Sequence, residues 1–297
     1  MKKMTKFFAL ALLAGAMVSC STEDTAPSVQ NDKVAVQFTG GISVNTRAAG
    51  LAWADGDMIG IFMTGTKQPL SADAIQEGVD NICYQTSGSI GFSPVSGGKT
   101  VFFPIDGDVD FYSYYPQTTV NDYKVALDVT DQGKQEAIDF MYAKTEGCNK
   151  ATPQVFLKFY HKLSNLVLDV QPGNGLTQED LKKMTVTVKG QNTKATFNLA
   201  DGTISGEGNP TDIKMKTTQA GKLYEAILLP TEEASRVIEF DLNNGYDAPF
   251  VWTMPAKLEG GKRYHYTVVK LSRSAVDISG NIEPWIKAGD DNEHIAQ

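Results

Sequence analysis

The stretch Val34-Ala35-Val36-Gln37-Phe38-Thr39-Gly40-Gly41-Ile42-Ser43-Val44 places an apolar residue or a glycine at every second position. This two-residue period is typical of a β-strand with one buried face. The five apolar side chains on that face are Val34, Val36, Phe38, Ile42 and Val44. Burying them would stabilise a domain by roughly 8 to 15 kcal/mol as an upper value, comparable with the whole stability of a typical domain. A domain that lost this strand would therefore need a replacement for it.

The residues after this strand indicate that it is a detachable piece of sheet. Asn45-Thr46-Arg47 ends the strand, and the small, flexible Ala48-Ala49-Gly50 follows. This arrangement favours assembly over catalysis. In the alternative interpretation, strand 34–44 is an ordinary first strand and Arg47 is an incidental surface residue.

The N-terminal segment predicts export and lipidation. Three lysines, at positions 2, 3 and 6, precede the twelve-residue apolar run Phe7–Val18, and Met17-Val18-Ser19-Cys20 resembles a lipobox. Twelve apolar residues are too few to span a bilayer, which needs about 20. We therefore predict a lipoprotein signal peptide over residues 1–19, with Cys20 as the lipidated first residue of the mature chain. The alternative is an ordinary secretory signal in which Cys20 has no role.

Residues 20–32 are predicted to form a tether between the lipid and the folded chain. They are rich in Ser, Thr, Asp and Pro, and Glu23-Asp24 resembles the acidic signal that places lipoproteins on the outer membrane surface of some Gram-negative anaerobes. Loss of the three signal-peptide lysines changes the net charge from -8 to -11. A basic surface for nucleic acid is therefore not expected, and only the lipid would hold the chain to the membrane.

Short strand-like runs separated by turn pairs predict an all-β fold of the sandwich type. The runs are 58–63, 100–103, 110–115, 125–129, 155–170, 184–188, 195–199, 223–229, 237–242, 250–253 and 264–271. Two short helices are predicted, Ser71–Val79 and Thr177–Lys183, the second with Thr177 and Asp180 at capping-box spacing. A composition break at 145–153 divides the chain into a domain over 33–151, a domain over 152–288 and a polar tail over 289–297.

The run 155–170 contains a change of parity. The apolar positions are odd up to Leu163 and even from Leu166, which predicts a bulge or kink near Ser164-Asn165. His161 lies on the apolar side and is interpreted as a satisfied core or rim histidine. Cys83 and Cys148 could form a disulfide in an exported protein, although their spacing does not require one and two buried thiols are favoured.

The chemical motifs that could indicate an enzyme are incomplete. Ser96-Gly97-Gly98-Lys99-Thr100 lacks the first glycine of a phosphate-binding loop, which falls on Ser93, and a strand follows it. Asp106, Asp108 and Asp110 start like a calcium loop, but Phe111 and Gln117 occupy its glycine and glutamate positions. No cofactor, metal or catalytic residue is predicted, although a carboxylate pair for glycoside hydrolysis stays open because such pairs meet only in the fold.

Several short motifs, in order along most of the mature chain, resemble the fimbrillin family, the subunits of protease-assembled pili in Gram-negative anaerobes. Besides the lipobox and strand 34–44, they are the runs Trp53–Ile61 and Phe159–Leu166, the turn Leu228-Leu229-Pro230 and the closing Ile282-Glu283-Pro284-Trp285. The resemblance implies two transthyretin-like, Greek-key β-sandwich domains and a role in cell adhesion. It also implies cleavage between Arg47 and Ala48 by an arginine-specific protease, followed by insertion of a strand from another pilus subunit.

The alternative function is a monomeric outer-membrane lipoprotein that binds glycans. Trp53, Trp252 and Trp285, or the cluster Tyr112, Tyr114 and Tyr115, could form an aromatic platform for sugars. An exposed coplanar pair would favour this alternative, and a first strand seated in a hydrophobic groove would favour the pilus subunit. The position in the pilus stays open, because residues 286–297 are short for a donor strand and 278–286 is the better candidate for the last strand; this favours a tip or accessory role over the shaft.

Overall fold

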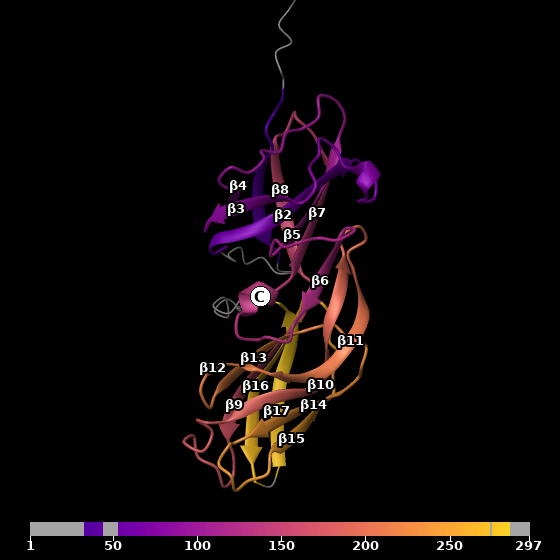
Figure 1. Cartoon of the computed structure of the whole chain (residues 1–297). Coiled ribbons are helices and arrows are strands. Elements are labelled where there is room, and N and C mark those ends of the chain that lie inside the picture. The colour runs from indigo at the N-terminus through magenta and orange to yellow at the C-terminus, as the bar shows by residue number, and fades with distance from the viewer. Residues whose placement is uncertain (1–32, 44–52, 274, 286–297) are drawn as a thin grey trace, which may run out of the picture. The chain divides into compact units, whose positions relative to one another are not determined.

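The computed structural model describes residues 33–43, 53–273 and 275–285 of the chain. The predictions for the signal peptide, Cys20, the tether, Val44, Arg47, Ala48 and the tail 289–297 lie outside the described residues. Within them, the prediction of an all-β fold is confirmed (Figure 1). The helices in this part are α1 (Gln135–Ile138) and the single 3₁₀ turn η1 (Ala72–Ala74). The described residues include no helix long and apolar enough to cross a membrane.

The strands follow one another along the whole described chain. They are β1 (Gln37–Ile42), β2 (Asp55–Gly65), β3 (Ile82–Ser87), β4 (Gly91–Pro94), β5 (Val109–Tyr115), β6 (Lys124–Asp128), β7 (Met141–Cys148), β8 (Gln154–His161), β9 (Ser164–Pro172), β10 (Thr185–Asn198), β11 (Thr203–Lys214), β12 (Lys216–Gln219), β13 (Leu223–Leu228), β14 (Arg236–Asp241), β15 (Phe250–Met254), β16 (Lys262–Ser272) and β17 (Ala275–Pro284).

The first half forms a closed barrel where a sandwich was predicted. Its strand order is β1-β4-β3-β2-β5-β7-β8, and the ring closes because β1 pairs with both β4 and β8. The pairing of β1 with β4 is antiparallel, whereas that of β1 with β8 is parallel. A closed ring leaves no free edge in the barrel, so its closure depends on the first strand.

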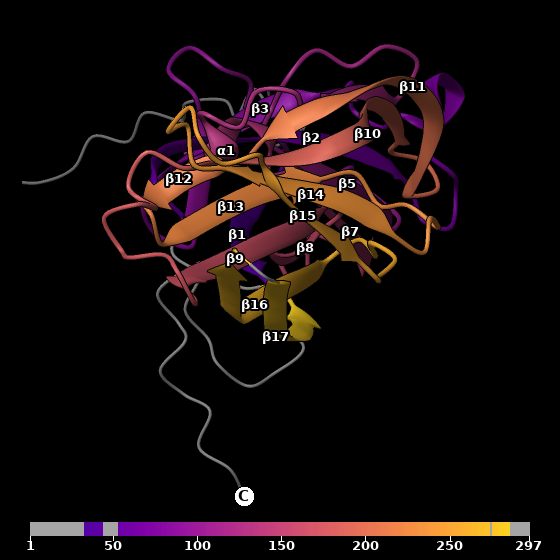
Figure 2. The ribbon, with the colours of Figure 1, turned by 90° about the horizontal axis from the view of Figure 1, so that it is seen from below.

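The remaining strands form two further sheets. One sheet has the order β11-β10-β14-β15, with β6 also paired to β10, and the other has the order β12-β13-β9-β16-β17. Leu166 and Leu168 of β9, Val186 of β10 and Ile238 of β14 belong to one buried cluster, so the two sheets share a core. Figure 2 shows β9, β16 and β17 side by side, in agreement with their pairing.

The parity change in 155–170 marks the point where the chain leaves the barrel. β8 alternates between buried and exposed residues and pairs with β1 and β7, whereas β9 is buried on both faces and pairs with β13 and β16. Lys162 and Leu163 separate them, so the strand is interrupted rather than bulged at Ser164-Asn165. The predicted division after residue 151 falls between β7 and β8, two strands of the same barrel.

The helix predictions were wrong, although part of the local chemistry is present. Thr177 and Asp180 exchange hydrogen bonds, with the Thr177 backbone N–H and hydroxyl each 2.7 Å from Asp180 Oδ2, but residues 177–183 form turns. The segment 71–79 contains only η1, and α1 was not predicted. Two helical turns provide too few hydrogen bonds to offset the cost of helix nucleation. Tertiary contacts therefore determine whether such a short segment is helical.

Two strand predictions also differ from the structure. The run 100–103 forms only an isolated bridge between Ala35 and Phe102. The runs 184–188 and 195–199 are parts of the single long strand β10, whose register with β11 shifts between Val188 and Gln191.

Cys83 and Cys148 are free, half-buried thiols, so the disulfide is not formed. Burial raises the pKa of the Cys83 thiol. Burial, reinforced by Asp110 and Asp108, raises the pKa of Cys148 to about 11. Both thiols are therefore weak nucleophiles near neutral pH.

Candidate functional site: the first strand, its groove and the adjoining cavity

The first strand inserts its apolar face into the barrel core. Val36 and Phe38 are 5% and 2% exposed, and Val34 and Ile42 are partly buried against the same core. The Phe38 ring meets Tyr84 and Phe111 edge to face, with ring centroids 5.2 and 5.1 Å apart. Burial thus alternates from Val34 to Gly40, whereas residues 41–43 all have intermediate exposure.

The backbone of this segment is hydrogen-bonded on both sides. Residues Gln37–Ile42 run alongside Gln154–Phe159 of β8 in unbroken parallel register. On the other side, the Gly40 N–H donates to the Ile90 carbonyl at 2.7 Å, and the Val36 N–H donates to the Val101 carbonyl at 3.0 Å. Removal of β1 would leave unpaired backbone groups on two neighbouring segments, which is unfavourable unless another strand takes its place.

The glycine at position 40 permits a close approach inside the barrel. A Cβ atom there would lie 2.8 Å from the Phe92 ring and 3.2 Å from the Phe159 ring. The Gly40 carbonyl also accepts a hydrogen bond of 2.8 Å from the indole N–H of Trp53. Trp53 in turn packs edge to face against Phe92, Tyr115 and Phe159. The central Gly40 of the first strand is thus fixed to Trp53, the first described residue after the predicted cleavage position.

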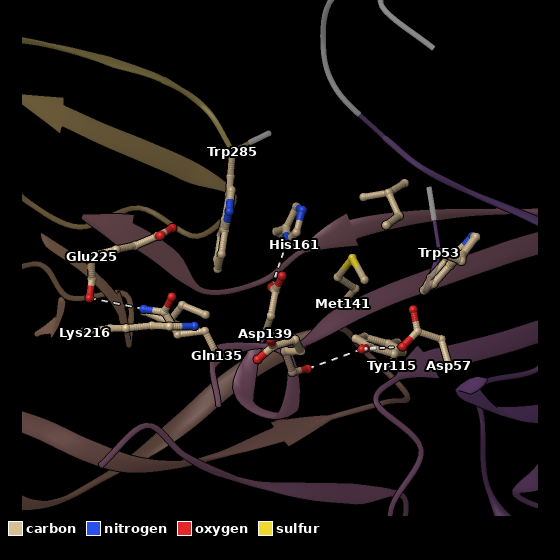
Figure 3. Close-up of a pocket in the computed structure, with 13 residues that line it drawn as sticks. Trp53, Asp57, Tyr115, Gln135, Asp139, Met141, His161, Lys216, Glu225 and Trp285 are labelled. Atoms are coloured by element: carbon tan, nitrogen blue, oxygen red, sulfur yellow. Dashed lines mark hydrogen bonds and ion pairs between the residues drawn. The ribbon is translucent and has the colours of Figure 1, made fainter. Parts of the chain in front are cut away.

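A cavity of about 210 Å³ adjoins Ile42, the last residue of β1 (Figure 3). Its lining residues come from the barrel, from α1 and the residue after it, from β12 and β13, and from the residue directly after β17. They are Ile42, Trp53, Asp57, Tyr115, Gln135, Glu136, Asp139, Met141, His161, Lys216, Glu225, Ile227 and Trp285. Four features of the family resemblance therefore contribute residues to one cavity: strand 34–44, the runs beginning at Trp53 and Phe159, and the closing motif 282–285.

His161 is the histidine among the lining residues of the cavity. Its Nδ1 lies 2.7 Å from Asp139 Oδ1, and its ring stacks on Trp285 with centroids 4.3 Å apart and an interplanar angle of 16°. The side chain is only 3% exposed, and its Nε2 has no hydrogen-bond partner among the described residues. His161 was predicted to have its hydrogen-bonding groups paired. This is so for Nδ1, whereas Nε2 has no partner among the described residues.

Tyr115 and Asp57 form a second polar pair in the lining. The Tyr115 hydroxyl donates to Asp57 Oδ1 at 3.0 Å, and Asp57 Oδ2 accepts from the Ala54 N–H at 2.7 Å. Burial, reinforced by the Asp57 carboxylate, raises the pKa of Tyr115 above its usual range. Tyr115 therefore acts as a hydrogen-bond donor rather than as an anion.

The aromatic platform of the glycan-binding alternative is absent from the described residues. Trp53 and Trp285 are 3% and 5% exposed, and the tyrosine cluster at 112, 114 and 115 is buried. Trp252 contacts Tyr266 at an interplanar angle of 78°, so these two rings are not coplanar.

The aspartates at 106, 108 and 110 do not form a cation site. The buried Asp110 accepts hydrogen bonds from the Thr66 hydroxyl and from the N–H groups of Lys67 and Gly147. Within the described segments, no group of three or more His, Cys, Asp or Glu residues could hold a metal ion.

Sequence patterns did not predict which residues pack against the first strand, nor several of the residues that line the cavity. Tyr84, Phe92 and Phe111 line the groove, and Asp139 and Lys216 line the cavity, yet each is distant in sequence from β1. Their roles arise from strand pairing between distant segments, which a single sequence does not encode locally.

Comparisons with known proteins all point to fimbrial and adhesion proteins. The family model described as Fimbrillin-like matches residues 46–285. Fim1C of Bacteroides uniformis, named as a candidate fimbrium subunit, is 33% identical over 293 residues, which is 93% of each chain. The crystal structure of a candidate cell adhesion protein from Bacteroides uniformis has a TM-score of 0.73 at 31% identity, covering 86% of this chain and 99% of that one. A candidate cell adhesion protein from Bacteroides ovatus has a TM-score of 0.68 at 25% identity, covering 86% and 98%.

Proposed function

Because the chain belongs to the fimbrillin-like family, we propose that it is a fimbrial subunit that assembles on the cell surface by exchange of its first strand. The family consists of structural subunits and not of enzymes. The related candidate fimbrium subunit and cell adhesion protein support a role in adhesion.

The observation that carries this proposal is the position of β1 in the barrel. It closes the ring between β4 and β8 and fills the core with Val36 and Phe38. At about 1.5 to 3 kcal/mol each, these two side chains alone contribute about 3 to 6 kcal/mol, a large part of a typical domain stability. A barrel without β1 exposes a hydrophobic groove flanked by two unpaired strands.

The proposed assembly has three steps. The chain is exported and lipidated at Cys20, and the lipid attaches it to the outer membrane. An arginine-specific protease cuts between Arg47 and Ala48 and so removes the segment that contains β1. A strand from a neighbouring subunit then enters the groove and restores both the side-chain packing and the backbone hydrogen bonds. A head-to-tail contact of this kind does not close on itself and generates a filament.

The C-terminal strand gives a further indication about position in the filament. β17 pairs with β16 over most of its length and forms the edge of its own sheet. A segment that is engaged in its own sandwich is not free to complete another subunit. We infer that this subunit occupies a tip or accessory position, with a sandwich of the transthyretin-like type implied by the family resemblance.

The substitution Arg47→Ala tests the cleavage and the assembly together. Treatment with an arginine-specific protease is expected to give wild-type chains that start at Ala48 and form filaments, while the variant stays a folded, lipidated monomer. Arg273→Ala is the matched control, because Arg273 is exposed and pairs with Asp247 far from β1 in sequence. N-terminal sequencing and electron microscopy report the two steps separately. Filaments of normal length from Arg47→Ala would contradict the proposal.

A further inference from the structure

β1 carries two adjacent glycines that face opposite sides of the barrel wall. Gly40 is buried on the same face as Phe38, whereas Gly41 lies on the outer face beside Phe156. Neither glycine has a positive φ, so the backbone at both positions is one that any residue adopts. The space around each position, and not the backbone, therefore decides whether a side chain can stand there.

The space opposite Gly40 is filled by aromatic rings that hold one another in place. A Cβ atom at position 40 would lie 2.8 Å from the Phe92 ring and 3.2 Å from the Phe159 ring. Both rings pack edge to face on Trp53, with centroids 5.1 and 5.2 Å from that of the indole. All three side chains are buried, so neither phenyl ring can turn away without displacing its neighbours. A side chain at position 40 therefore overpacks the closed barrel.

The space beside Gly41 is also occupied, but by a ring that is free to move. A Cβ atom at position 41 would lie 2.8 Å from Cζ of Phe156, the same distance as the closest contact at Gly40. Phe156 is 53% exposed and Cζ is the far end of its ring, so a small rotation into the solvent removes the contact. Equal distances at two neighbouring positions thus have opposite consequences, because one neighbour is buried and the other is not.

We propose that the groove of β1 selects an incoming strand by size at the position of Gly40. This inference rests on the proposed strand exchange and names the class of segment that takes part in it. The strand that fits carries glycine at this position, an aromatic residue two positions before it and an apolar residue two positions after it, as Phe38, Gly40 and Ile42 do here. The position of Gly41 accepts side chains of any size.

The same glycine fixes the register of the strand. β1 pairs in parallel with Gln154–Phe159 of β8, and Phe38 is opposite Phe92 of β4. A slip by one residue would turn the apolar side chains out of the core, whereas a slip by two residues would keep them inside. A slip by two in either direction would, however, place the side chain of Phe38 or of Ile42 against the Phe92 ring. Apolar alternation alone permits such slipped pairings, and the glycine position excludes them.

A competition between peptides measures this selection. The full-length chain is cut after Arg47 with an arginine-specific protease and incubated with an excess of two peptides of residues 33–43, the native one and one variant, at equal concentrations. Native mass spectrometry then gives the ratio of the two complexes, which is the ratio of their affinities. The Gly40→Val peptide should bind at least about tenfold more weakly than the native peptide. The Gly41→Val peptide is the matched control and should bind within about threefold of the native one, because it adds the same side chain on the outer face.

Two further variants assign the effect to the groove and to one ring. A Phe38→Ala peptide should bind at least about a hundredfold more weakly, because it lacks the ring that packs against Tyr84 and Phe111 in the place of β1. Phe92→Leu in the chain removes the ring edge nearest to Gly40 and keeps an apolar side chain. In this chain the discrimination against the Gly40→Val peptide should decrease at least about threefold.

The outcomes separate the size selection from the strand exchange on which it rests. Equal binding of the native and Gly40→Val peptides would overturn the size selection and leave strand exchange in place. Equal weakening by Gly40→Val and Gly41→Val, or unchanged discrimination in the Phe92→Leu chain, would also overturn it, because the effect would then not come from the buried ring. A chain that is not cut after Arg47, that takes up no peptide, or that takes up the Phe38→Ala peptide as well as the native one would contradict strand exchange, and the size selection would fall with it.

Discussion

The barrel and the sandwich are built from similar strands, but they close their cores in different ways. The barrel closes through β1, which lies at the start of the described chain and pairs with β8 more than 100 residues later. The sandwich is formed almost entirely by strands that come after β8, and its central strands β9 and β10 do not depend on the first segment. The first strand is therefore part of the barrel core, whereas the two sheets of the sandwich do not include it.

The strand β5 contributes side chains to both cores. All seven of its residues are buried. Val109 and Phe111 belong to the barrel core with Phe38, whereas Tyr112 and Tyr114 belong to the cluster that contains the sandwich core. A strand with two buried faces has apolar and aromatic residues on both of them, here interrupted only by the buried Asp110 and Ser113, and does not show the alternation of a half-buried strand.

The largest expected effect is that of removing the first strand. Deletion of residues 33–43 should destabilise the barrel by several kcal/mol, because it removes Val36 and Phe38 at about 1.5 to 3 kcal/mol each and leaves two strands unpaired. Hydrogen exchange monitored by mass spectrometry should show lost protection in β4, β5 and β8 and retained protection in β9, β14 and β16. A synthetic peptide of residues 33–43 should restore protection in the barrel. Equal loss of protection in both halves would show that the two cores are not independent.

The first strand also shows which features a sequence can predict and which it cannot. Its alternating pattern predicts the buried face correctly at Val36 and Phe38, because the period of a strand is a local property. The closed ring could not be predicted, since it requires the parallel pairing of Gln37–Ile42 with Gln154–Phe159. Likewise, the apolar parity of 155–170 predicts a bulge or kink near Ser164-Asn165, but not that the chain changes sheets there. The cavity lies beyond sequence reasoning for the same reason, since His161, Asp139 and Trp285 meet only in the folded chain.

A smaller effect is expected from a single methyl group at the centre of the first strand. Gly40→Ala would place a Cβ 2.8 Å from the Phe92 ring, and overpacking of this kind costs about 1 to 3 kcal/mol. Gly208→Ala in β11 of the sandwich is the matched control, because a Cβ there meets nothing within 4 Å. The control should be neutral or slightly stabilising. The comparison is made from urea unfolding midpoints of the two variants. Similar destabilisation by both substitutions would contradict a specific effect of the close approach at β1, because the entropy effect of Gly→Ala is itself stabilising.

The smallest expected effect is on the reactivity of the cysteines. Cys83 and Cys148 lie in the barrel strands β3 and β7, and the sandwich strands contain no cysteine, so these thiols report on the barrel alone. Burial, with Asp110 and Asp108, raises the pKa of Cys148 to about 11, so the native barrel retains this proton when an unfolded chain, with a cysteine pKa near 8.5, would release it. The contribution of this thiol to stability is therefore fully present below about pH 8.5 and is lost as the pH rises toward 11.

Alkylation by iodoacetamide at pH 8 should be slow in the intact protein and should become faster when residues 33–43 are deleted, since the opened barrel exposes both thiols to water. Cys83→Ser and Cys148→Ser, each measured alone, identify which strand opens. Labelling that is unchanged by the deletion would mean that the barrel stays closed without its first strand, and the contrast between the two cores would then have to be abandoned.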